Sequence, residues 1–222
     1  FALPASCFVG LHSPLAARRA GLYRLPMDRF FLPDLDSALL SGPEAHHCLH
    51  VMRHGPNDRI VVFNGRGREA TAVIESATKD TARLAYVTRA DFPRPAWRLV
   101  LVQAVPKAKQ MDGILQKATE LGVTDIVPVI SERSVVQLAD DRAESKAAKW
   151  RQIVIEAGKQ CGQNWLPDVH EPVSAKDYFR RAPSVDISLI GSLQPGAVSF
   201  KQALADYERE HQRRPQSVAM LI

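Results

Sequence analysis

The hydrophobic period of the chain changes once, at Ala90–Ala96 (ADFPRPA), a stretch with two prolines and no periodicity. Before this stretch, residues 27–89 carry short segments with the pattern of strands. After it, residues 97–222 alternate between short apolar runs and longer segments with an apolar residue at every third or fourth position. This change predicts two domains of different class, and we interpret residues 90–96 as the linker between them.

The first domain, residues 27–89, has the pattern of a small β structure. Segments 59–64 (RIVVFN) and 68–76 (REATAVIES) flank Gly65-Arg66-Gly67, and the Asn-Gly pair before the turn is a strong hairpin signal. A further strand is expected over 82–88. One short helix is expected over 43–53, with proline in its first turn and glycine after its end. Several strands with one helix predict a closed or half-closed barrel.

The second domain has the pattern of an α/β sheet. Residues 98–104 (RLVLVQA) form a nearly continuous apolar run, typical of a strand buried on both faces. Pro128 is expected to place strand 125–130 at a sheet edge or at a bulge. Connections as long as a helix imply parallel strands with right-handed crossovers, and ligands of such sheets bind beyond the carboxyl ends of the strands. Strands are expected over residues 98–104, 125–130, 186–190 and 217–222. Helices are expected over residues 109–121 and 141–161 and from residue 199.

Two motifs in the first domain resemble ligand sites but fit structural roles better. Residues 65–70 match a relaxed G-x-G-x-x-A dinucleotide fingerprint, yet a strand-like segment follows where that fingerprint requires a helix. Four histidines crowd the short helix, and the pairs His46/His50 and His50/His54 have the i, i+4 spacing of metal ligands. No acidic residue lies between them as in H-E-x-x-H, and no distant Cys/His set completes four ligands. We therefore expect a hairpin at the first motif and no metal at His46, His47, His50 and His54.

Positive charge is concentrated locally rather than overall. The chain carries a formal charge of +5, but residues 1–26 hold three arginines and no acid, which leaves 26 Lys and Arg against 24 Asp and Glu from Met27 onward. Binding to a polyanion must therefore depend on local clusters. A phosphate-backbone groove is predicted from seven basic residues on the two domains, namely Arg29, Arg53, Arg66, Arg68, Lys107, Lys109 and Lys117.

The compartment is indicated by cysteine use and by the absence of long apolar runs. Three cysteines without C-x-x-C spacing suit a reducing cytosol, and no run reaches the about 18–20 apolar residues of a membrane span. A cytoplasmic location without membrane contact is expected. Residues 1–26, rich in arginine and free of acids, are interpreted as an organelle leader or as vector-derived or misassigned sequence before Met27.

Four segments in order resemble the ribosomal RNA small subunit methyltransferase E family. They are MDRFFLP at residues 27–33, EAHHCLHVMR with the VFNGRG hairpin over 44–67, KQMDGILQKATELGVTDIVPVISERSVV at 109–136, and KWRQIVIEAGKQCGQNWLPDV at 149–169. The resemblance covers residues 27–222. It implies a PUA-like barrel for RNA and a SPOUT methyltransferase domain, a parallel α/β sheet with a trefoil knot. It also implies a homodimer that methylates uridine N3 of 16S ribosomal RNA in the small subunit with S-adenosyl-L-methionine.

The resemblance also implies where the methyl donor binds. In this family the last apolar strand runs into a GPEGG-type loop that binds the donor, and the sequence given stops before that position, so we expect the methyltransferase domain to be incomplete. The ends of two strands match stretches that line the cofactor pocket, and these are Leu189, Ile190, Gly191, Leu221 and Ile222.

Methylation of uridine N3 requires the N3 proton to be removed and the resulting anion to be stabilised. Arg29 and Arg133 are the cationic candidates. Three carboxylates could act as the base or could orient an arginine, namely Glu120, Glu132 and Glu156. The alternative for each residue is a structural salt bridge.

Two other functions stay open at this point. The chain could be a non-catalytic ribosomal RNA-binding module or an inactive truncated fragment of a methyltransferase. It could also be an α/β enzyme that acts on a small molecule, in which case it should not show salt-dependent RNA binding.

Overall fold

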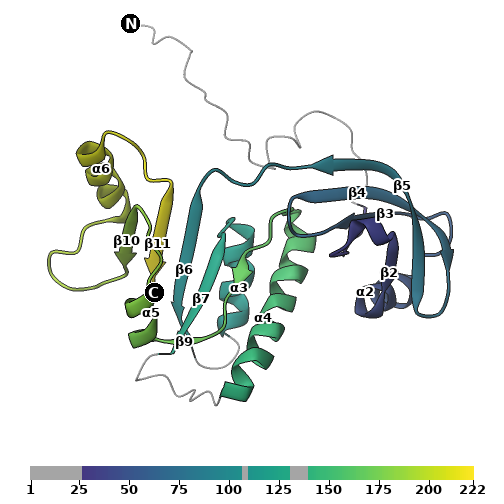
Figure 1. Cartoon of the computed structure of the whole chain (residues 1–222), viewed down its shortest axis with the longest axis horizontal. Helices are drawn as coiled ribbons and strands as arrows, with labels where there is room; N and C mark the ends of the chain where they lie inside the picture. The colour runs from purple at the N-terminus through teal and green to yellow at the C-terminus, as the bar shows by residue number, and fades with distance from the viewer. Residues whose placement is uncertain (1–26, 107–109, 131–139) are drawn as a thin grey trace, which may run out of the picture.

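The computed structural model describes residues 27–106, 110–130 and 140–222 of the chain, and the backbone only for residues 140–143. It shows a curved, mostly antiparallel sheet beside a parallel α/β sheet, with the long helix α4 reaching from one to the other (Figure 1). The expected fold class, a β-rich part followed by a parallel α/β sheet, is confirmed. Among the described residues, no helix is both long enough and apolar enough to cross a bilayer.

The first sheet has five strands in the order β1-β3-β4-β5-β2. Only the β1–β3 pair is parallel, and no pairing between β1 and β2 closes the sheet, which makes it a half-barrel. β5 extends past the expected end at Thr88, because Ala90 pairs with Glu69 and Asp91 with Arg68. The strands are β1 (Arg29–Phe31), β2 (Leu39–Ser41), β3 (Arg59–Phe63), β4 (Arg68–Ala77) and β5 (Thr81–Asp91).

The helical segment of the half-barrel starts one residue before the expected position. α2 (Gly42–His46) has proline in its first turn and continues directly into the π-helical turn η2 (His47–Val51). A short 3-10 turn, η1 (Leu35–Ser37), precedes β2. The buried core beneath these turns comes from alternate residues of the strands and from both helical turns, and its largest members are Phe30, Leu40, Ile60, Val62 and Ile74.

The second sheet has the order β10-β11-β6-β7-β8 with every pair parallel, and β9 pairs with β7 as well. Its strands are β6 (Arg98–Ala104), β7 (Asp125–Ile130), β8 (Asp168–Val169), β9 (Val173–Ser174), β10 (Ile187–Ile190) and β11 (Ser217–Leu221). β6 and β7 have the bounds expected from the sequence. The trefoil knot that the resemblance implies stays a prediction.

Helices cover both faces of this sheet, as two-sided burial of its strands requires. Leu101 packs with α3 (Gln110–Glu120) and α4 (Asp140–Cys161) on one face. Its neighbours Val100 and Val102 point to the other face, where they pack with Tyr178 of α5 (Ala175–Arg181). The last helix, α6 (Phe200–His211), connects β10 to β11 at the far end of the sheet (Figure 1).

Pro128 does not place β7 at an edge, because β6 pairs along one side and two short strands pair along the other. β8 pairs with Asp125 and Ile126, and β9 pairs with Val129 and Ile130. The imino nitrogen of Pro128 cannot donate to a ladder, and the residue falls in the interval between these two short strands. The expectation of an edge strand was wrong. The pairing beside Pro128 is interrupted by a gap between β8 and β9, while β7 itself stays inside the sheet.

Candidate functional site

The carboxyl edge of the parallel sheet brings two separate strand ends together. β10 and β11 run side by side so that Ile190 pairs with Leu221, and Gly191 N donates to Leu221 O at 2.9 Å. On the other side of β11, Ile222 N donates to Val102 O at 3.0 Å. All five residues expected to line a cofactor pocket, residues 189–191 and 221–222, therefore lie on two adjacent strand ends.

Large apolar side chains are exposed at this edge. The exposed fractions are 70% for Ile190, 60% for Ile222 and 104% for Leu193, which lies shortly after β10. Exposed apolar area of this kind is unfavourable in water and is typical of surfaces that bind a ligand or another part of a protein. Behind it, the amide of Gln103, which is buried, donates to the carbonyl oxygens of Ala104 (2.9 Å) and Ile222 (3.3 Å).

The amino edge of the same sheet meets the half-barrel, and Arg29 of β1 lies in that junction. Its guanidinium donates to Glu69 Oε2 at 3.0 Å, to Asn164 Oδ1 at 2.5 Å and to the Gly158 carbonyl at 3.3 Å. The same group lies 4.4 Å above the centre of the Phe63 ring. Only 11% of the side chain is exposed. Arg29 thus links the half-barrel to the end of α4.

Lys159 of α4 forms a second link across the junction. Its ammonium group donates to Glu44 Oε1 and Glu156 Oε1, each at 3.1 Å, and lies 3.2 Å from His47 Nδ1. Glu44 also accepts from the Phe31 backbone N–H at 2.9 Å. The lysine side chain is only 6% exposed, so a buried cation is matched by a carboxylate from each domain.

The β3–β4 turn packs against the loop between α4 and β8. Gly67 N donates to Asn164 O at 2.8 Å, and Leu166 N donates to Gly65 O at 3.0 Å. Both glycines have positive φ, and a Cβ on Gly67 would lie 2.6 Å from the Trp165 ring. The residues 65–70 motif is therefore a hairpin that needs glycine for turn geometry and close packing, as expected, and not a dinucleotide fingerprint.

A polar cluster lies at the starts of β6, β7 and β8. Arg98 donates to both carboxylate oxygens of Asp125, at 3.0 and 3.2 Å, and His170 Nε2 lies 3.4 Å from Asp125 Oδ1. Burial of Asp125 acts to raise its pKa, but the hydrogen bonds from His170, Arg98 and Thr124 outweigh it, so the pKa lies well below the usual range. The same carboxylate raises the pKa of His170.

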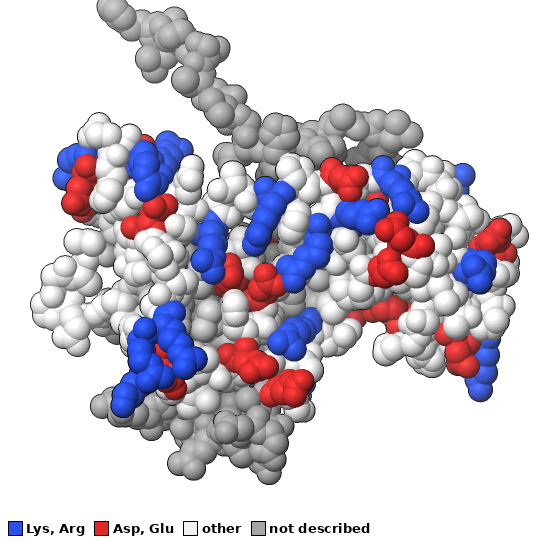
Figure 2. Space-filling model, viewed as in Figure 1, with Lys and Arg blue, Asp and Glu red and all other residues white. Residues whose placement is uncertain are grey.

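Of the basic residues expected to contact RNA, Arg29 is buried in the junction, and three others form ion pairs on the surface. Arg66 binds Asp168 at 2.5 Å, Arg68 binds Asp36 at 3.4 Å, and Lys117 binds Glu120 at 2.8 Å. Arg53 is exposed and has a φ of 60°. Figure 2 shows basic side chains interspersed with acidic ones across this face rather than a continuous basic stripe. The predictions for Lys107 and Lys109 fall outside the described residues.

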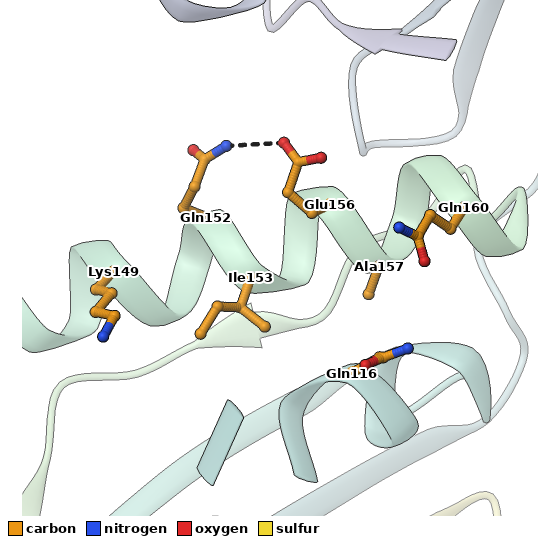
Figure 3. A pocket seen from close by; sticks show the side chains of 7 residues that line it. All are labelled: Gln116, Lys149, Gln152, Ile153, Glu156, Ala157 and Gln160. Atoms are coloured by element: carbon orange, nitrogen blue, oxygen red, sulfur yellow. Dashed lines mark hydrogen bonds between the residues drawn. The ribbon is translucent and has the colours of Figure 1, made fainter. Parts of the chain in front are cut away.

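Two of the proposed catalytic carboxylates lie near an open groove of about 310 Å³ between α3 and α4 (Figure 3). Glu156 lines it and accepts from Gln152, while Glu120 binds Gln116 at 2.9 Å on the opposite wall. Hydrogen bonds from Lys117 and Gln116 lower the pKa of Glu120. The lining residues are Gln116, Lys149, Gln152, Ile153, Glu156, Ala157 and Gln160.

Three of the five residues proposed for catalysis, Arg29, Glu120 and Glu156, lie toward the opposite edge of the sheet from the expected cofactor residues. Glu120 ends α3 just before the amino end of β7, and Glu156 and Arg29 lie by the α4 end that leads into β8. Strands as long as β6 and β7 place the carboxyl edge roughly 20 Å away. The predictions for Glu132 and Arg133 fall outside the described residues, although both directly follow β7 in the sequence.

The histidines of the first domain have separate contacts. His47 faces Lys159, His54 lies 2.9 Å from Asp28, and His50 Nε2 lies 2.7 Å from the Lys79 carbonyl oxygen. Across the described ranges, no group of three or more His, Cys, Asp or Glu side chains is arranged to hold a metal ion. Burial raises the pKa of the Cys48 thiol to about 12 and that of Cys161 above its usual value, so neither is a ready nucleophile.

Sequence reasoning did not single out Lys159, Trp165 or His170. Lys159 lies within a run of charged residues typical of a solvated helix face, and its partner Glu44 is 115 residues away. His170 and its partner Asp125 are 45 residues apart. The one available signal was the pair of glycines, Gly158 and Gly162, which indicated close packing near the end of α4. A Cβ on Gly158 would lie 2.2 Å from Leu166, so close packing at this position requires glycine.

Comparisons with known families agree with both domains. A family described as RNA methyltransferase domain matches residues 93–222, and a family described as RNA methyltransferase PUA domain matches residues 40–85. The first match covers more than half of the chain. The resemblance stated from the sequence and the predicted fold class are confirmed.

Among curated relatives, ribosomal RNA small subunit methyltransferase E of Bacillus subtilis (strain 168) is 29% identical over 170 residues, which is 74% of this chain and 66% of the relative. The enzyme of that name from Synechocystis is 28% identical over 144 residues, 64% of this chain and 45% of the relative. The chain thus spans less than two thirds of the length of these relatives.

Solved structures give the same picture. Ribosomal RNA small subunit methyltransferase E from Neisseria gonorrhoeae, bound to S-adenosyl methionine, superposes with a TM-score of 0.73 at 32% identity, covering 88% of this chain and 79% of that chain. A Legionella pneumophila protein solved in complex with S-adenosylmethionine superposes with a TM-score of 0.76 at 27% identity, with the same coverage.

Proposed function

This chain belongs to the ribosomal RNA small subunit methyltransferase E family, and we propose that it methylates N3 of a uridine in 16S ribosomal RNA with S-adenosyl-L-methionine. The observation that carries the proposal is that β10 and β11 end side by side at the carboxyl edge of a parallel sheet, where apolar side chains are exposed. Ligands of open parallel sheets bind beyond this edge. The relative from Neisseria gonorrhoeae was solved with S-adenosyl methionine bound.

The residues at the carboxyl edge fit the methyl donor. Ile190 and Ile222 supply exposed apolar surface for an adenosyl group, the partly buried Leu221 lies beside Ile190, and Gly191 adds backbone without a side chain. A Cβ at Gly191 would lie 3.7 Å from Leu221 O, so the backbone is close to its neighbour there without crowding. When bound, S-adenosyl-L-methionine supplies a methyl group activated by a sulfonium. The side chains named here would hold and orient the donor and exclude water.

A uridine N3 nucleophile needs its proton removed and its negative charge stabilised. Arg133 and Glu132 directly follow β7 in the sequence, so they are our candidates for the cation and the base. Arg29, Glu120 and Glu156 lie toward the opposite edge, roughly 20 Å from the expected cofactor residues by strand length. Within one chain their proposed role is to shape the junction or to contact RNA. A catalytic role for them requires a second chain.

Assembly and location complete the proposal. We propose that the chain assembles as a homodimer, which the family resemblance implies. A cytoplasmic location matches the ribosomal RNA substrate and the two free cysteines among the described residues, Cys48 and Cys161.

The test is methyl transfer from radiolabelled S-adenosyl-L-methionine to 16S ribosomal RNA, with the modified base identified by mass spectrometry. Calorimetric titration of the donor into the 222-residue chain is run in parallel. Label in N3-methyluridine supports the proposal, and label in another base overturns the site of transfer. A folded chain that binds RNA but no donor indicates the non-catalytic alternative. In a chain that is active, Arg133→Ala should cut transfer without lowering the unfolding midpoint.

A further inference from the structure

The linker between β5 and β6 exposes two aromatic side chains. Phe92 is 42% exposed and Trp97 is 51% exposed. Both belong to the segment that joins β5 to β6, and Figure 1 shows this segment connecting the half-barrel to the parallel sheet. Burial of side chains this large would be strongly favourable, so their exposure marks a surface that is available to a partner.

A third aromatic side chain and an arginine adjoin the linker. Trp165 Nε1 donates to the Phe92 carbonyl at 3.0 Å, which fixes the indole ring beside the chain. The guanidinium carbon of Arg94 lies 5.9 Å from the centre of that ring. Pro93 and Pro95 flank Arg94 and restrict the backbone to extended conformations. The linker therefore presents its side chains on a stiff backbone.

The surface continues along the amino edge of the sheet. Trp97 directly precedes β6, and Trp165 lies shortly before β8, which is two strands away. With strands about 4.8 Å apart, the starts of β6 and β8 lie about 10 Å apart along this edge. Arg66 pairs with Trp165 by a backbone bridge, and 57% of its side chain is exposed. Arg66 and Arg94 thus both adjoin Trp165.

We propose that this surface, which we call the linker ledge (Arg66, Phe92, Arg94, Trp97 and Trp165), binds unpaired nucleotides of the RNA substrate by base stacking. The proposal rests on the proposed function, which makes the partner an RNA. An unpaired strand offers base faces along its whole length for aromatic side chains to stack on, whereas the bases inside a duplex are already stacked on each other, and arginines add contacts to phosphates and to base faces. The ledge therefore favours single-stranded RNA over a duplex.

Arginine between aromatic side chains also occurs in protein interfaces, but two observations favour RNA. Among the described residues, the Arg94 guanidinium has a ring contact and no carboxylate partner, so it can bind a phosphate without breaking an ion pair. The Arg66–Asp168 pair is exposed, and a phosphate can replace the carboxylate at little cost.

The test is the affinity of the chain for a fluorescein-labelled oligouridine of about ten nucleotides, measured by fluorescence anisotropy, beside a duplex of the same length. Trp97→Ala and Arg94→Ala should each weaken single-strand binding about tenfold and duplex binding much less. Trp97→Phe, which keeps a ring, should restore most of the affinity. Arg94→Ala should also reduce the salt dependence by about one phosphate contact, whereas Trp97→Ala should not.

Phe179→Ala and Arg181→Ala are matched controls, because both side chains are exposed on α5 and should leave the affinity unchanged. Unaltered single-strand affinity in Trp97→Ala and Arg94→Ala would overturn the linker ledge while the proposed function stands. A wild-type chain that binds no RNA would contradict both. If Trp97→Ala instead abolishes a self-association seen by light scattering, the surface is a protein contact and the proposal is wrong.

Discussion

The amino and carboxyl edges of the parallel sheet differ in how far their charged groups are paired and their apolar side chains are buried. At the amino edge, Arg29 and Lys159 are almost fully buried, and each bonds partners from both domains. At the carboxyl edge, Ile190 and Ile222 are mostly exposed, and Gly191 bonds only to the neighbouring strand. The amino edge is therefore packed like a protein interior, whereas the carboxyl edge is exposed to solvent.

The difference separates residues that stabilise the fold from residues that are free to bind. A buried ion pair that loses one partner leaves an uncompensated charge, whereas an exposed apolar side chain can change at little cost to folding. We therefore expect mutations at the amino edge to act on stability and mutations at the carboxyl edge to act on ligand binding.

The largest expected effect is that of Lys159→Ala. Removing the ammonium leaves Glu44, whose side chain is 14% exposed, without its cation, and should lower the free energy of unfolding by about 3–5 kcal/mol. Urea unfolding followed by circular dichroism measures it. Lys149→Ala on the exposed side of the same helix is the control and should change stability by no more than about 0.5 kcal/mol. Equal midpoints for the two variants would show that the junction is not a buried ion pair.

Gly67→Ala should cost about 3 kcal/mol, because the new Cβ meets both backbone strain and the Trp165 ring. Gly67 has a φ of +88°, and the Cβ would lie 2.6 Å from Trp165 and from the Phe92 carbonyl oxygen. Gly196 has nearly the same φ, +86°, with nothing within 4 Å. Gly196→Ala therefore reports the strain alone and should cost about 1–2 kcal/mol in thermal unfolding. If the two alanines cost the same, close packing at the junction contributes nothing.

His170→Ala should show a smaller effect that depends on pH. The hydrogen bond to Asp125 raises the pKa of His170 from 6.5, so the folded state holds the proton more tightly than the unfolded chain. The stabilisation is complete below pH 6.5 and is lost as the pH rises through the folded-state pKa. Since half of the side chain is exposed, we expect a loss below about 1 kcal/mol near pH 6 and almost none near pH 9.

Thermal melts at the two pH values measure this difference. His46→Ala, which removes an exposed histidine at the end of α2, should shift the melting temperature equally at both. A His170→Ala penalty that grows with pH would contradict the assigned direction.

Ile190→Glu should have the smallest effect on folding and a large one on binding. The side chain is 70% exposed, so the unfolding free energy should change by less than about 0.5 kcal/mol. In a chain that binds S-adenosyl-L-methionine, a carboxylate at this position should weaken the calorimetric affinity at least about tenfold, because it places charge against the apolar face of the ligand. Unchanged affinity would place the donor away from β10.

Local sequence determined the elements themselves. The apolar runs gave the bounds of β6 and β7, the Asn-Gly pair gave the β3–β4 hairpin, and the change of period near residue 90 gave the two sheet classes. Each of these depends on residues close in sequence, so a pattern can report it. Pro128 shows the limit, since its effect fell on the neighbouring strands β8 and β9, which the sequence pattern did not reveal.

Only the tertiary structure decided which charges are buried together and which edge they occupy. Arg29 was a candidate for catalysis because of its residue type. Asn164 is 135 residues away in the sequence, and the fold brings its side-chain oxygen to 2.5 Å from the Arg29 guanidinium. The sequence could identify the expected cofactor residues through family resemblance, but not that Glu120 and Glu156 lie toward the other edge. Chain direction through a parallel sheet sets that distance, because every crossover helix returns its carboxyl end to the amino edge of the strands.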